Sequence, residues 1–532
     1  MAISNSSTLA VYSFVIVVFA HYFTKALKRW RATGNPPGLP YPPGPRGLPI
    51  LGNIRQIPEM NPWLTYAEWG REYGTSSVPT LDAAAGRLTR RLTRRLTRYA
   101  KALWDHIVVI NSANIATDLL EKRSNIYAHI PMIRLMGWDF NMAFMRYGDR
   151  WRRNRRLFHQ YFRREATTQY QAIELRKVHE MLRGLLVKPK DFRAHIRKYV
   201  YSKRLGWLAL TSSSLSGAII MSVVYGYDIK PVDDEFVAVA EAAFERLGGS
   251  VFPGAMAVNM FPFLRHLPGW LPGLGFQKYC AETRVLTAKM KEDTYEFAKQ
   301  RMSPSSISTF FMAMALHPDV QRRAQNDIDI IVGSSRLPNF SDRESLPYIE
   351  AIYREVMRWK PVIPLAVSRA ATADNEYHGY FIPKGTTVID NIWAMAYDEE
   401  YFPEPNEFKP ERFLDTDGAI INEPHMQQVL AYGQVVPDFA STFLKPIFSH
   451  GRRICPGRYM ADDTVWAAIV SVLAAYNIDK AKDASGREID ILDMKFSDTL
   501  ISHPETFECA ISPRSPAAKK LIEQTSPHSV DG

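Results

Sequence analysis

The sequence predicts a mainly α-helical protein with a small β subdomain, attached to a membrane at its N-terminus. Residues 9–23 form an almost wholly apolar run, and a positive cluster follows it at residues 25–31. A proline-rich stretch comes next at residues 35–49, and residues 458–475 have the apolar periodicity of a long helix. The chain has 532 residues, 46% of them hydrophobic, so it can bury a large core. Disordered and collagen-like classes of protein are excluded.

The apolar run at the N-terminus is expected to be a retained membrane anchor. A cleaved signal peptide carries positive charge before its apolar segment and small residues after it. Residues 1–7 contain no Lys or Arg, and no A-x-A site follows the run. We therefore expect residues 1–31 to form a single-pass anchor with the rest of the chain in the cytoplasm. The run is short for a bilayer, so it would tilt or include Thr8 and Thr24.

The proline-rich stretch is expected to separate the anchor from a single large domain. Prolines fix φ and remove backbone donors, so residues 32–50 are predicted to form a stiff hinge. The alternative interpretation is a proline-rich ligand for a partner protein. The main domain is predicted to span residues 51–515, followed by a C-terminal tail at residues 516–532.

The net charge of +11 is confined to two short windows. Residues 87–101 hold six Arg and one Lys with no acidic residue, and residues 25–31 supply four more positive charges. The remaining chain is neutral overall, whereas a groove for a polyanion would spread its charge over the domain. We therefore expect no nucleic-acid partner. The chain has only three cysteines, which argues against a disulfide framework.

One cysteine has surroundings that favour chemistry. Cys455 lies in a loop with two glycines and a proline, and Arg452, Arg453 and Arg458 flank it. Positive charge and the N-terminal end of the helix that follows both favour a thiolate. Because no second Cys and no paired His is nearby, this thiolate suits a single iron better than a four-ligand zinc site.

The cysteine loop closely resembles the haem-ligand loop of the cytochrome P-450 superfamily. Residues 448–457 match its pattern F-x-x-G-x-R-x-C-x-G. Residues 355–358 resemble the E-x-x-R helix of that family, residues 408–413 the segment that contacts this helix, and residues 151–155 its W-x-x-x-R helix. These matches occur in the family's order and cover most of the chain. The resemblance implies a cytochrome P-450-type fold with an N-terminal membrane anchor, in a fungal, microsomal member resident in the endoplasmic reticulum membrane.

The resemblance also assigns roles to the residues around the cofactor. Cys455 would be the axial thiolate ligand of a haem iron. Trp151, Arg155 and Arg453 would hold the haem propionates, because a guanidinium fork suits a carboxylate. Arg369 falls where relatives often have a propionate-facing His or Arg.

A structural network is implied on the proximal side of the haem. Glu355, Arg358 and Arg412 would form it, and none of them would be catalytic. Taken alone, Glu355 and Arg358 could equally be an ordinary surface pair three residues apart on a helix. Trp151 and Arg155 could likewise belong to a basic amphipathic face. The co-occurrence of these patterns with the cysteine loop favours the family roles.

The sequence departs from the family at the oxygen-activating helix. This helix normally carries an [AG]-G-x-[DE]-T run, which is missing here. Residues 305–318 match the end of the helix, but residues 299–304 directly before them read Lys-Gln-Arg-Met-Ser-Pro. Proline is tolerated at a helix start. The sequence therefore predicts that the helix lacks its N-terminal half.

Two groups of residues could replace the missing acid and alcohol. Asp293 and Thr294 are adjacent, but they lie in a charged amphipathic segment without small residues. Ser306, Ser308 and Thr309 are nearer and have no acidic neighbour in the required place. We therefore assign no catalytic residue, and the sequence does not indicate which residues would deliver protons to bound oxygen.

Two stretches are predicted to be insertions. Residues 75–105 contain Arg-Leu-Thr-Arg three times in succession. This stretch is interpreted as a low-complexity surface insertion, and the alternative is a basic amphipathic helix that lies on anionic lipid. Residues 434–449 separate Tyr432-Gly433 from His450, and in relatives such an aromatic-Gly pair runs directly into Gly-Arg-Arg. Phe448 would then match the motif only by its spacing. Two insertions and one loss at such places are typical of an imperfect gene model.

The resemblance implies a monooxygenase that inserts one oxygen atom from O2 into a lipophilic small molecule, in fungal secondary metabolism. Electrons would come from an NADPH-dependent reductase docked on a basic face. Its arginines, set against the single Asp149, are Arg146, Arg150, Arg152, Arg153, Arg155 and Arg156. One alternative is a haem-binding but catalytically impaired member of the family. Another is an interaction protein that uses the basic repeat on membrane lipid.

Overall fold

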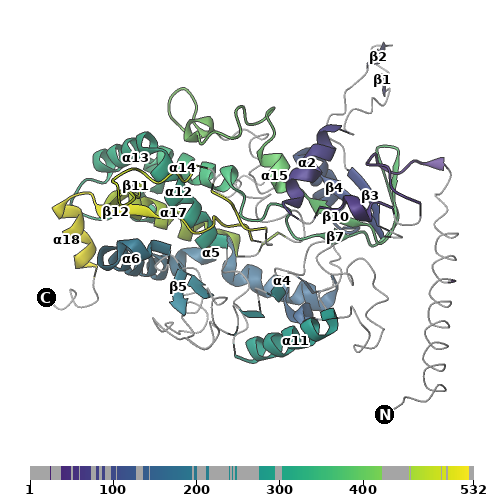
Figure 1. The fold of residues 1–532 in the computed structure, drawn as a ribbon, viewed down its shortest axis with the longest axis horizontal. Coiled ribbons are helices and arrows are strands. Elements are labelled where there is room, and N and C mark those ends of the chain that lie inside the picture. The colour runs from purple at the N-terminus through teal and green to yellow at the C-terminus, as the bar shows by residue number, and fades with distance from the viewer. Residues whose placement is uncertain are drawn as a thin grey trace.

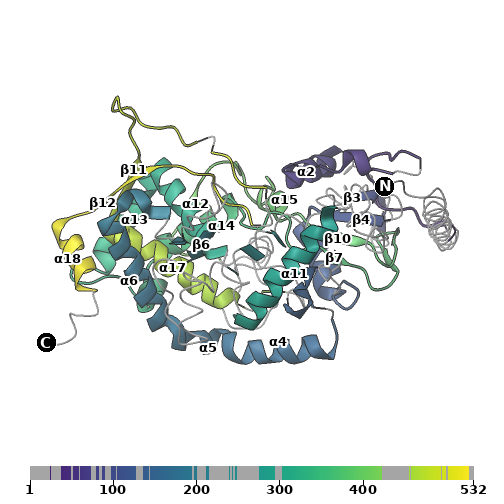
Figure 2. The same ribbon diagram turned by 60° about the horizontal axis from the view of Figure 1, so that its bottom comes forward.

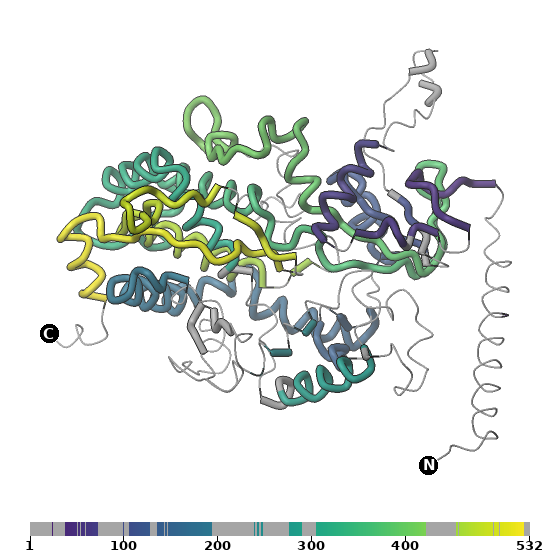
Figure 3. Tube along the Cα trace, viewed as in Figure 1, coloured from purple at the N-terminus to yellow at the C-terminus, as the bar shows by residue number. Residues whose placement is uncertain are grey.

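The structure is a computed structural model, and it separates a helical part from a small sheet. It describes Thr24, short pieces between 239 and 247, and, with a few positions left out, residues 38–72, 80–82, 87–89, 98–127, 136–193, 197–200, 211–214, 275–293, 302–421 and 454–525. Helices α6, α12, α13, α14 and α17 gather on one side, and strands β3, β4, β10 and β7 lie on the other (Figure 1). Figure 3 follows the same path as a tube. The predicted class, mainly α with small sheets, is confirmed.

The helices have the following bounds: α2 Pro62–Glu72, α3 Ala113–Ala116, α4 Asp149–Phe162, α5 Arg164–Thr167, α6 Gln171–Val187, α11 Gly275–Asp293, α12 Met302–Leu316, α13 Pro318–Ile331, α14 Pro347–Trp359, α15 Ile392–Ala396, α17 Arg458–Ala475 and α18 Pro516–Gln524. A π-helical turn, η3 (Thr117–Lys122), continues α3, and two 3-10 turns matter below, η10 (Phe340–Ser345) and η11 (Pro410–Phe413).

The strands are β1 Thr80–Asp82, β2 Arg87–Thr89, β3 Arg98–Ala102, β4 Asp105–Ile110, β5 Arg197–Val200, β6 Thr211–Ser214, β7 Arg369–Ala370, β8 Asn375–Tyr377, β9 Tyr380–Ile382, β10 Thr387–Asp390, β11 Tyr476–Lys480 and β12 Cys509–Pro513. The largest sheet has the order β3-β4-β10-β7. Its central pair, β4 and β10, is parallel, with Val108 opposite Val388, and both outer pairs are antiparallel.

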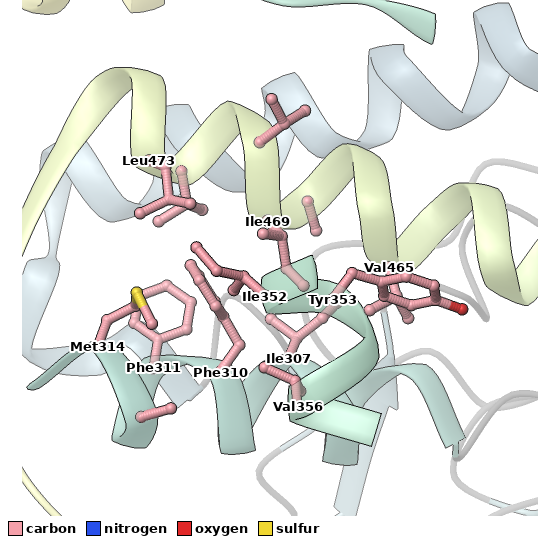
Figure 4. Close-up of a cluster of buried hydrophobic side chains, with 14 of the residues drawn as sticks. Ile307, Phe310, Phe311, Met314, Ile352, Tyr353, Val356, Val465, Ile469 and Leu473 are labelled. Carbon is pink, nitrogen blue, oxygen red and sulfur yellow. The ribbon is translucent and has the colours of Figure 1, made fainter. Parts of the chain in front are cut away.

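The helical core is built from α12, α14 and α17. Phe310, Phe311 and Met314 of α12 meet Ile352 of α14 and Ile469 of α17, and each of these side chains is fully buried (Figure 4). Burying a side chain of this size contributes about 1.5–3 kcal/mol relative to leaving it in water. Because α17 is apolar on most of its surface, it can be enclosed by the other two helices, and this fixes the segment that follows Cys455.

Two helices and one 3-10 turn begin with the residues that such starts favour. Pro318 and Pro347 each open a helix at a position where no backbone donor is needed. Before η10, Asn339 accepts a hydrogen bond from the backbone N–H of Ser341 at 2.8 Å, and Asp342 accepts one from the backbone N–H of Asn339 at 2.8 Å. This capping box fixes the turn that carries Arg343.

One end of the first predicted insertion belongs to the fold. Residues 98–102 form β3, which pairs with β4 along its whole length, from Arg98 opposite Val109 to Ala102 opposite Asp105. Residues 98–102 therefore form a strand of the largest sheet, and the insertion at 75–105 stays a prediction. In the described part of the chain, β1 and β2 pair only with each other.

The proline-rich segment is attached to the sheet. The backbone N–H of Tyr99 donates to the carbonyl of Pro43 at 3.1 Å, and that of Phe381 donates to Pro40 at 2.9 Å. The ring of Tyr41 stacks on Tyr99 with centroids 5.0 Å apart. Residues 38–49 therefore lie against β3 and β9, and we call them the strap.

Replacing Gly44 by alanine is expected to lift the strap. A Cβ at Gly44 would press on the carbonyl oxygen of Tyr99 and lie 3.0 Å from its carbon, and backbone atoms have little freedom to move away. Overpacking of this kind costs about 2–3 kcal/mol, measurable by denaturant unfolding. The matched control is Gly148→Ala, where a Cβ meets nothing within 4 Å. This control change weakens a helix start by no more than about 1 kcal/mol. Equal losses of unfolding free energy in both variants would contradict the tight contact at Gly44.

The predicted C-terminal tail begins with a helix. Residues 516–524 form α18, whose start is capped by the Ser515 hydroxyl, which accepts from the Ala518 N–H at 3.0 Å. Ile522 is fully buried, and α18 lies beside α6 (Figures 1 and 3). Arg183 of α6 donates to the Thr525 carbonyl at 2.7 Å. Residues 516–524 therefore pack on the core as a helix, and the domain boundary at residue 515 stays a prediction.

Several predictions lie outside the described residues. They concern the anchor at residues 1–31 (apart from Thr24), the second insertion at 434–449, and Arg453. Among the helices that the structure describes, none is long and apolar enough to cross a bilayer.

Candidate functional site

The predicted ligand Cys455 lies directly before α17, whose first residue is Arg458. Its side chain is half-buried, and it packs against the helical core together with Ile454. Arg458 turns back over the loop and donates from Nη1 to the Cys455 carbonyl at 3.1 Å. Backbone N–H groups at a helix start favour negative charge nearby, so the thiol lies where an anion is stabilised.

Helix α4 brings Arg155 to this loop. Its Nη1 donates to the Ile454 carbonyl at 2.5 Å, next to Cys455. Figure 2 shows α4 and α5 close to the end of α17 that begins at Arg458. Burial and the nearby charge of Arg458 lower the pKa of Arg155 to about 10, while Cys455 acts in the opposite direction. A partly buried guanidinium that is disfavoured in this way is suited to an incoming anion.

Trp151 lies one helical turn before Arg155 on α4 and is buried. Its indole Nε1 donates to the Met142 carbonyl at 3.1 Å, and its ring lies 5.2 Å from that of Tyr147. The structure therefore places Trp151 on the same helix as Arg155, with its polar atom directed to the segment before the helix.

The other two cysteines differ from Cys455. Cys280 on α11 and Cys509 on β12 are both buried. Burial raises the pKa of the Cys280 thiol, and it raises that of Cys509 to about 12. Both therefore favour the neutral thiol, which is a poor metal ligand. Among the described residues, no group of three His, Cys, Asp or Glu side chains could hold a metal ion.

Glu355, Arg358 and Arg412 meet in the interior. Arg358 donates to both oxygens of Glu355, from Nε at 2.7 Å and from Nη2 at 2.8 Å, and both side chains are fully buried. Arg412 donates from Nε to Glu355 Oε1 at 3.2 Å. The interpretation as an ordinary surface pair is wrong, because neither Glu355 nor Arg358 reaches solvent.

The arginines of this group also hold the segment that leads from α15 to η11. Arg358 donates to the carbonyls of Ala396 at 3.1 Å and Pro405 at 2.9 Å. Arg412 donates to the Pro403 carbonyl at 2.9 Å. A single ion-paired cluster therefore satisfies the backbone of a segment without regular structure, as buried carbonyls require.

Arg369 lies in the sheet. It is buried on β7, opposite Val388 of β10. Burial lowers its pKa, and the carboxylates that act on it are those of Asp390 and Glu121. The structure therefore gives Arg369 acidic protein neighbours, whereas Arg155 is the predicted residue that reaches the Cys455 loop.

Helix α12 begins at Met302 in the described part of the chain, with Pro304 in its first turn. Ser305 donates to the Ser502 carbonyl at 2.5 Å, and the side chains of Ser308 and Thr309 are fully buried. Asp293 is the last residue of α11, and Thr294 lies outside the described residues. No acid and alcohol pair is present among the described residues of α12.

Two features of the region were not assigned from the sequence. From the sequence, Arg458 is only a charge that flanks the cysteine. A cation at the first position of a helix is disfavoured by the helix dipole, and this position therefore indicated that an anion lies nearby. The cluster around Arg343 and Asp463, described below, was also missed. Its signal was a pair of adjacent acids, Asp462 and Asp463, on an otherwise apolar helix.

Comparison with known proteins decides the family. The family profile described as Cytochrome P-450 matches residues 297–507. Cytochrome P-450 monooxygenase COX1 of Coprinopsis cinerea is 34% identical over 98% of this chain and 100% of its own length. Monooxygenase 208 of Postia placenta is 33% identical (91% of this chain, 92% of its own). Monooxygenase claR of Ampulloclitocybe clavipes is 33% identical (90% and 88%).

The chain belongs to the cytochrome P-450 family. The relatives named above are fungal monooxygenases. Cytochromes P-450 use haem with a cysteine thiolate as axial ligand, and they generally take O2, a lipophilic substrate and electrons from a redox partner. Around Cys455 this chain fits such a group, because a half-buried thiol near a helix start lies beside a partly buried guanidinium that an anion would stabilise.

Proposed function

We propose that this cytochrome P-450 holds haem through the Cys455 thiolate. The supporting observation is the position of Cys455 at the start of α17, beside Arg155 and Arg458, while Cys280 and Cys509 are buried and favour the neutral thiol. The haem iron supplies the activation of O2 that no protein side chain provides. Arg155 would give up its bond to the Ile454 carbonyl for a propionate, with Trp151, Arg369 and Arg453 as further propionate-binding residues.

The proposed reaction inserts one oxygen atom from O2 into a lipophilic small molecule of fungal secondary metabolism. Residues 1–31 would anchor the enzyme in the endoplasmic reticulum membrane. Electrons would arrive from NADPH through a reductase on the exposed face of α4, where the exposed arginines are Arg150, Arg152, Arg153 and Arg156. Asp149 is the acid in this stretch and already pairs with Arg152. Such a face attracts an acidic partner.

A second candidate function is haem binding with impaired turnover. It is favoured by α12, whose described residues offer buried serines and a threonine without an acid. Proton delivery needs a group that can give up and regain a proton near neutral pH, and a hydroxyl alone does not. Sequencing the transcript would test whether the missing residues before Met302 and the insertions belong to the expressed protein.

The two candidates are separated by two measurements on the full-length protein. In the first measurement, both candidates predict that the dithionite-reduced, CO-bound protein shows the red-shifted Soret band of thiolate-ligated haem. Under the monooxygenase function, it also oxidises members of a lipophilic substrate panel with NADPH and a fungal reductase. A band without turnover favours the second candidate. Absence of the band in protein that is folded by circular dichroism overturns both.

A further inference from the structure

A group of buried carboxyls lies where α6, α14 and α17 come together, away from the residues used in the proposed function. Its members are Glu174 on α6, Glu350 on α14, and Asp462 and Asp463 on α17. Glu174 is completely buried and Asp463 is 7% exposed, while the side chains of Glu350 and Asp462 are each 14% exposed. We call these four residues the carboxylate cluster.

Three guanidinium groups contact the carboxylate cluster. Arg343 of η10 donates to Glu350 Oε2 at 2.9 Å, to Asp462 Oδ2 at 3.0 Å and, more weakly, to Asp463 Oδ1 at 3.3 Å. Arg354 donates to Glu350 Oε1 at 3.2 Å, and Arg164 lies 3.9 Å from Asp462 Oδ2. These cations are therefore committed to Glu350, Asp462 and Asp463.

Glu174 is the carboxyl that receives no cation. Its Oε1 accepts a long hydrogen bond of 3.3 Å from the Thr464 hydroxyl, and its Oε2 has no hydrogen-bond partner. Among the described residues, no Lys or Arg lies within ion-pair distance of it. A buried carboxylate without a positive partner costs several kcal/mol, whereas the protonated acid avoids this penalty.

The surrounding charges act in the same direction. Asp463 and Asp462 face Glu174 directly from α17, and Arg343, already shared among three carboxylates, is the cation that opposes them. Behind these groups lie Glu350, Arg354 and the Tyr353 phenol of α14, and Arg164 of α5. Burial, with Asp463 and Asp462, raises the pKa of Glu174 well above its ordinary value, and burial with Asp462 raises that of Asp463 to about 6.

We infer that Glu174 is protonated in the folded protein at neutral pH, and that its neutral carboxyl allows α6 to pack closely on α17. The two helices are joined there by reciprocal bonds. Gln171 of α6 donates to Asp463 Oδ2 at 3.4 Å, and Thr464 of α17 donates to Glu174. Loss of the proton would place a second negative charge beside Asp463 inside this joint. Because α17 begins three residues after Cys455, the joint supports the helix that carries the ligand loop.

The consequence for stability has a definite sign. A carboxyl with a raised pKa in the folded state binds its proton more tightly there than in the unfolded chain. Its contribution to stability is complete below the unfolded pKa, near 4.3 for Glu, and is lost as pH rises through the folded pKa. Asp463 adds its own loss of stability, which is complete a little above pH 6. Above that pH, the loss of stability that Glu174→Gln removes belongs to Glu174. Cys280 and Cys509, whose pKa values are also raised, add a separate loss only at about pH 8.5 and above.

The test compares urea unfolding of the full-length protein, followed by circular dichroism, between pH 6.5 and 9. Relative to Glu174→Gln, which keeps the shape of the neutral acid, the unfolding constant of the wild type should rise by up to about tenfold per pH unit. The matched control is Glu165→Gln on α5, where the carboxyl is 70% exposed. This variant should follow the wild type at every pH.

Parallel profiles for the wild type and Glu174→Gln would overturn the inference. If Glu174→Gln does not fold, Asp463→Asn replaces it, because removal of the facing charge should shrink the alkaline loss of stability. An unchanged loss in Asp463→Asn would equally overturn the inference. The readout needs no haem, so absence of the CO band would leave this result interpretable.

Discussion

Replacing Cys455 by alanine is expected to abolish the red-shifted Soret band of the reduced, CO-bound protein. The thiolate is the donor that produces this band, and Cys280 and Cys509 lie buried on α11 and β12. Both favour the neutral thiol, so neither is expected to supply the thiolate in place of Cys455. We expect Cys455→Ala to retain little haem or to show an unshifted band, measured against protein concentration.

The matched control for this change is Cys280→Ala. Cys280 is 7% exposed and packs as a small apolar side chain. Its replacement should leave the band in place. A band that persists in Cys455→Ala and disappears in Cys280→Ala would contradict the ligand assignment. Loss in both variants would point to unfolding, which the far-ultraviolet circular dichroism spectrum detects.

Replacing Glu355 by glutamine is expected to destabilise the protein by about 3–5 kcal/mol. Arg358 is completely buried and makes both of its ion-pair bonds to Glu355. Without the carboxylate, its charge would remain inside the core, with backbone carbonyls as its remaining partners. The loss should appear as a lower midpoint in denaturant unfolding and as a smaller amount of folded protein.

Glu523→Gln is the control for this second change. Glu523 lies on α18, and both it and Lys519, its partner at 3.9 Å, are 56% exposed. Exposed pairs of this kind are worth less than about 0.5 kcal/mol. If Glu355→Gln lost no more than this control, the buried network would not be what holds the segment before η11.

The motifs of the sequence predicted the family and the helical class. They assigned Arg155 to a haem propionate, and the structure places it beside the Ile454 carbonyl. Burial was harder to predict. Glu355 and Arg358 are three residues apart, which places them on one helix face whether that face is exposed or enclosed. Only the carbonyls of distant segments, such as that of Pro405, show that the pair is interior.

The sequence did not indicate the place of two segments whose partners are remote in sequence. The basic repeat ends at Arg98, and the repeat pattern gave no reason to separate β3 from it. The helix α18 was expected to be a tail, although Ser515 and Pro516 are typical of a helix start and Ile522 supplies its buried contact. Both segments take their place from contacts with β4 and α6 that local propensity does not encode.

The sheet has a consequence for synthesis of the chain. Ile110 on β4 pairs with Asp390 on β10, about 280 residues later. At about 5–20 residues per second, the β4 edge stays without its parallel partner for about 15 to 55 s while the intervening helices emerge. An unpaired strand edge is a site where chaperones bind and where aggregation starts. We therefore expect the nascent chain to be bound by chaperones at β4, and aggregation during expression to involve this edge.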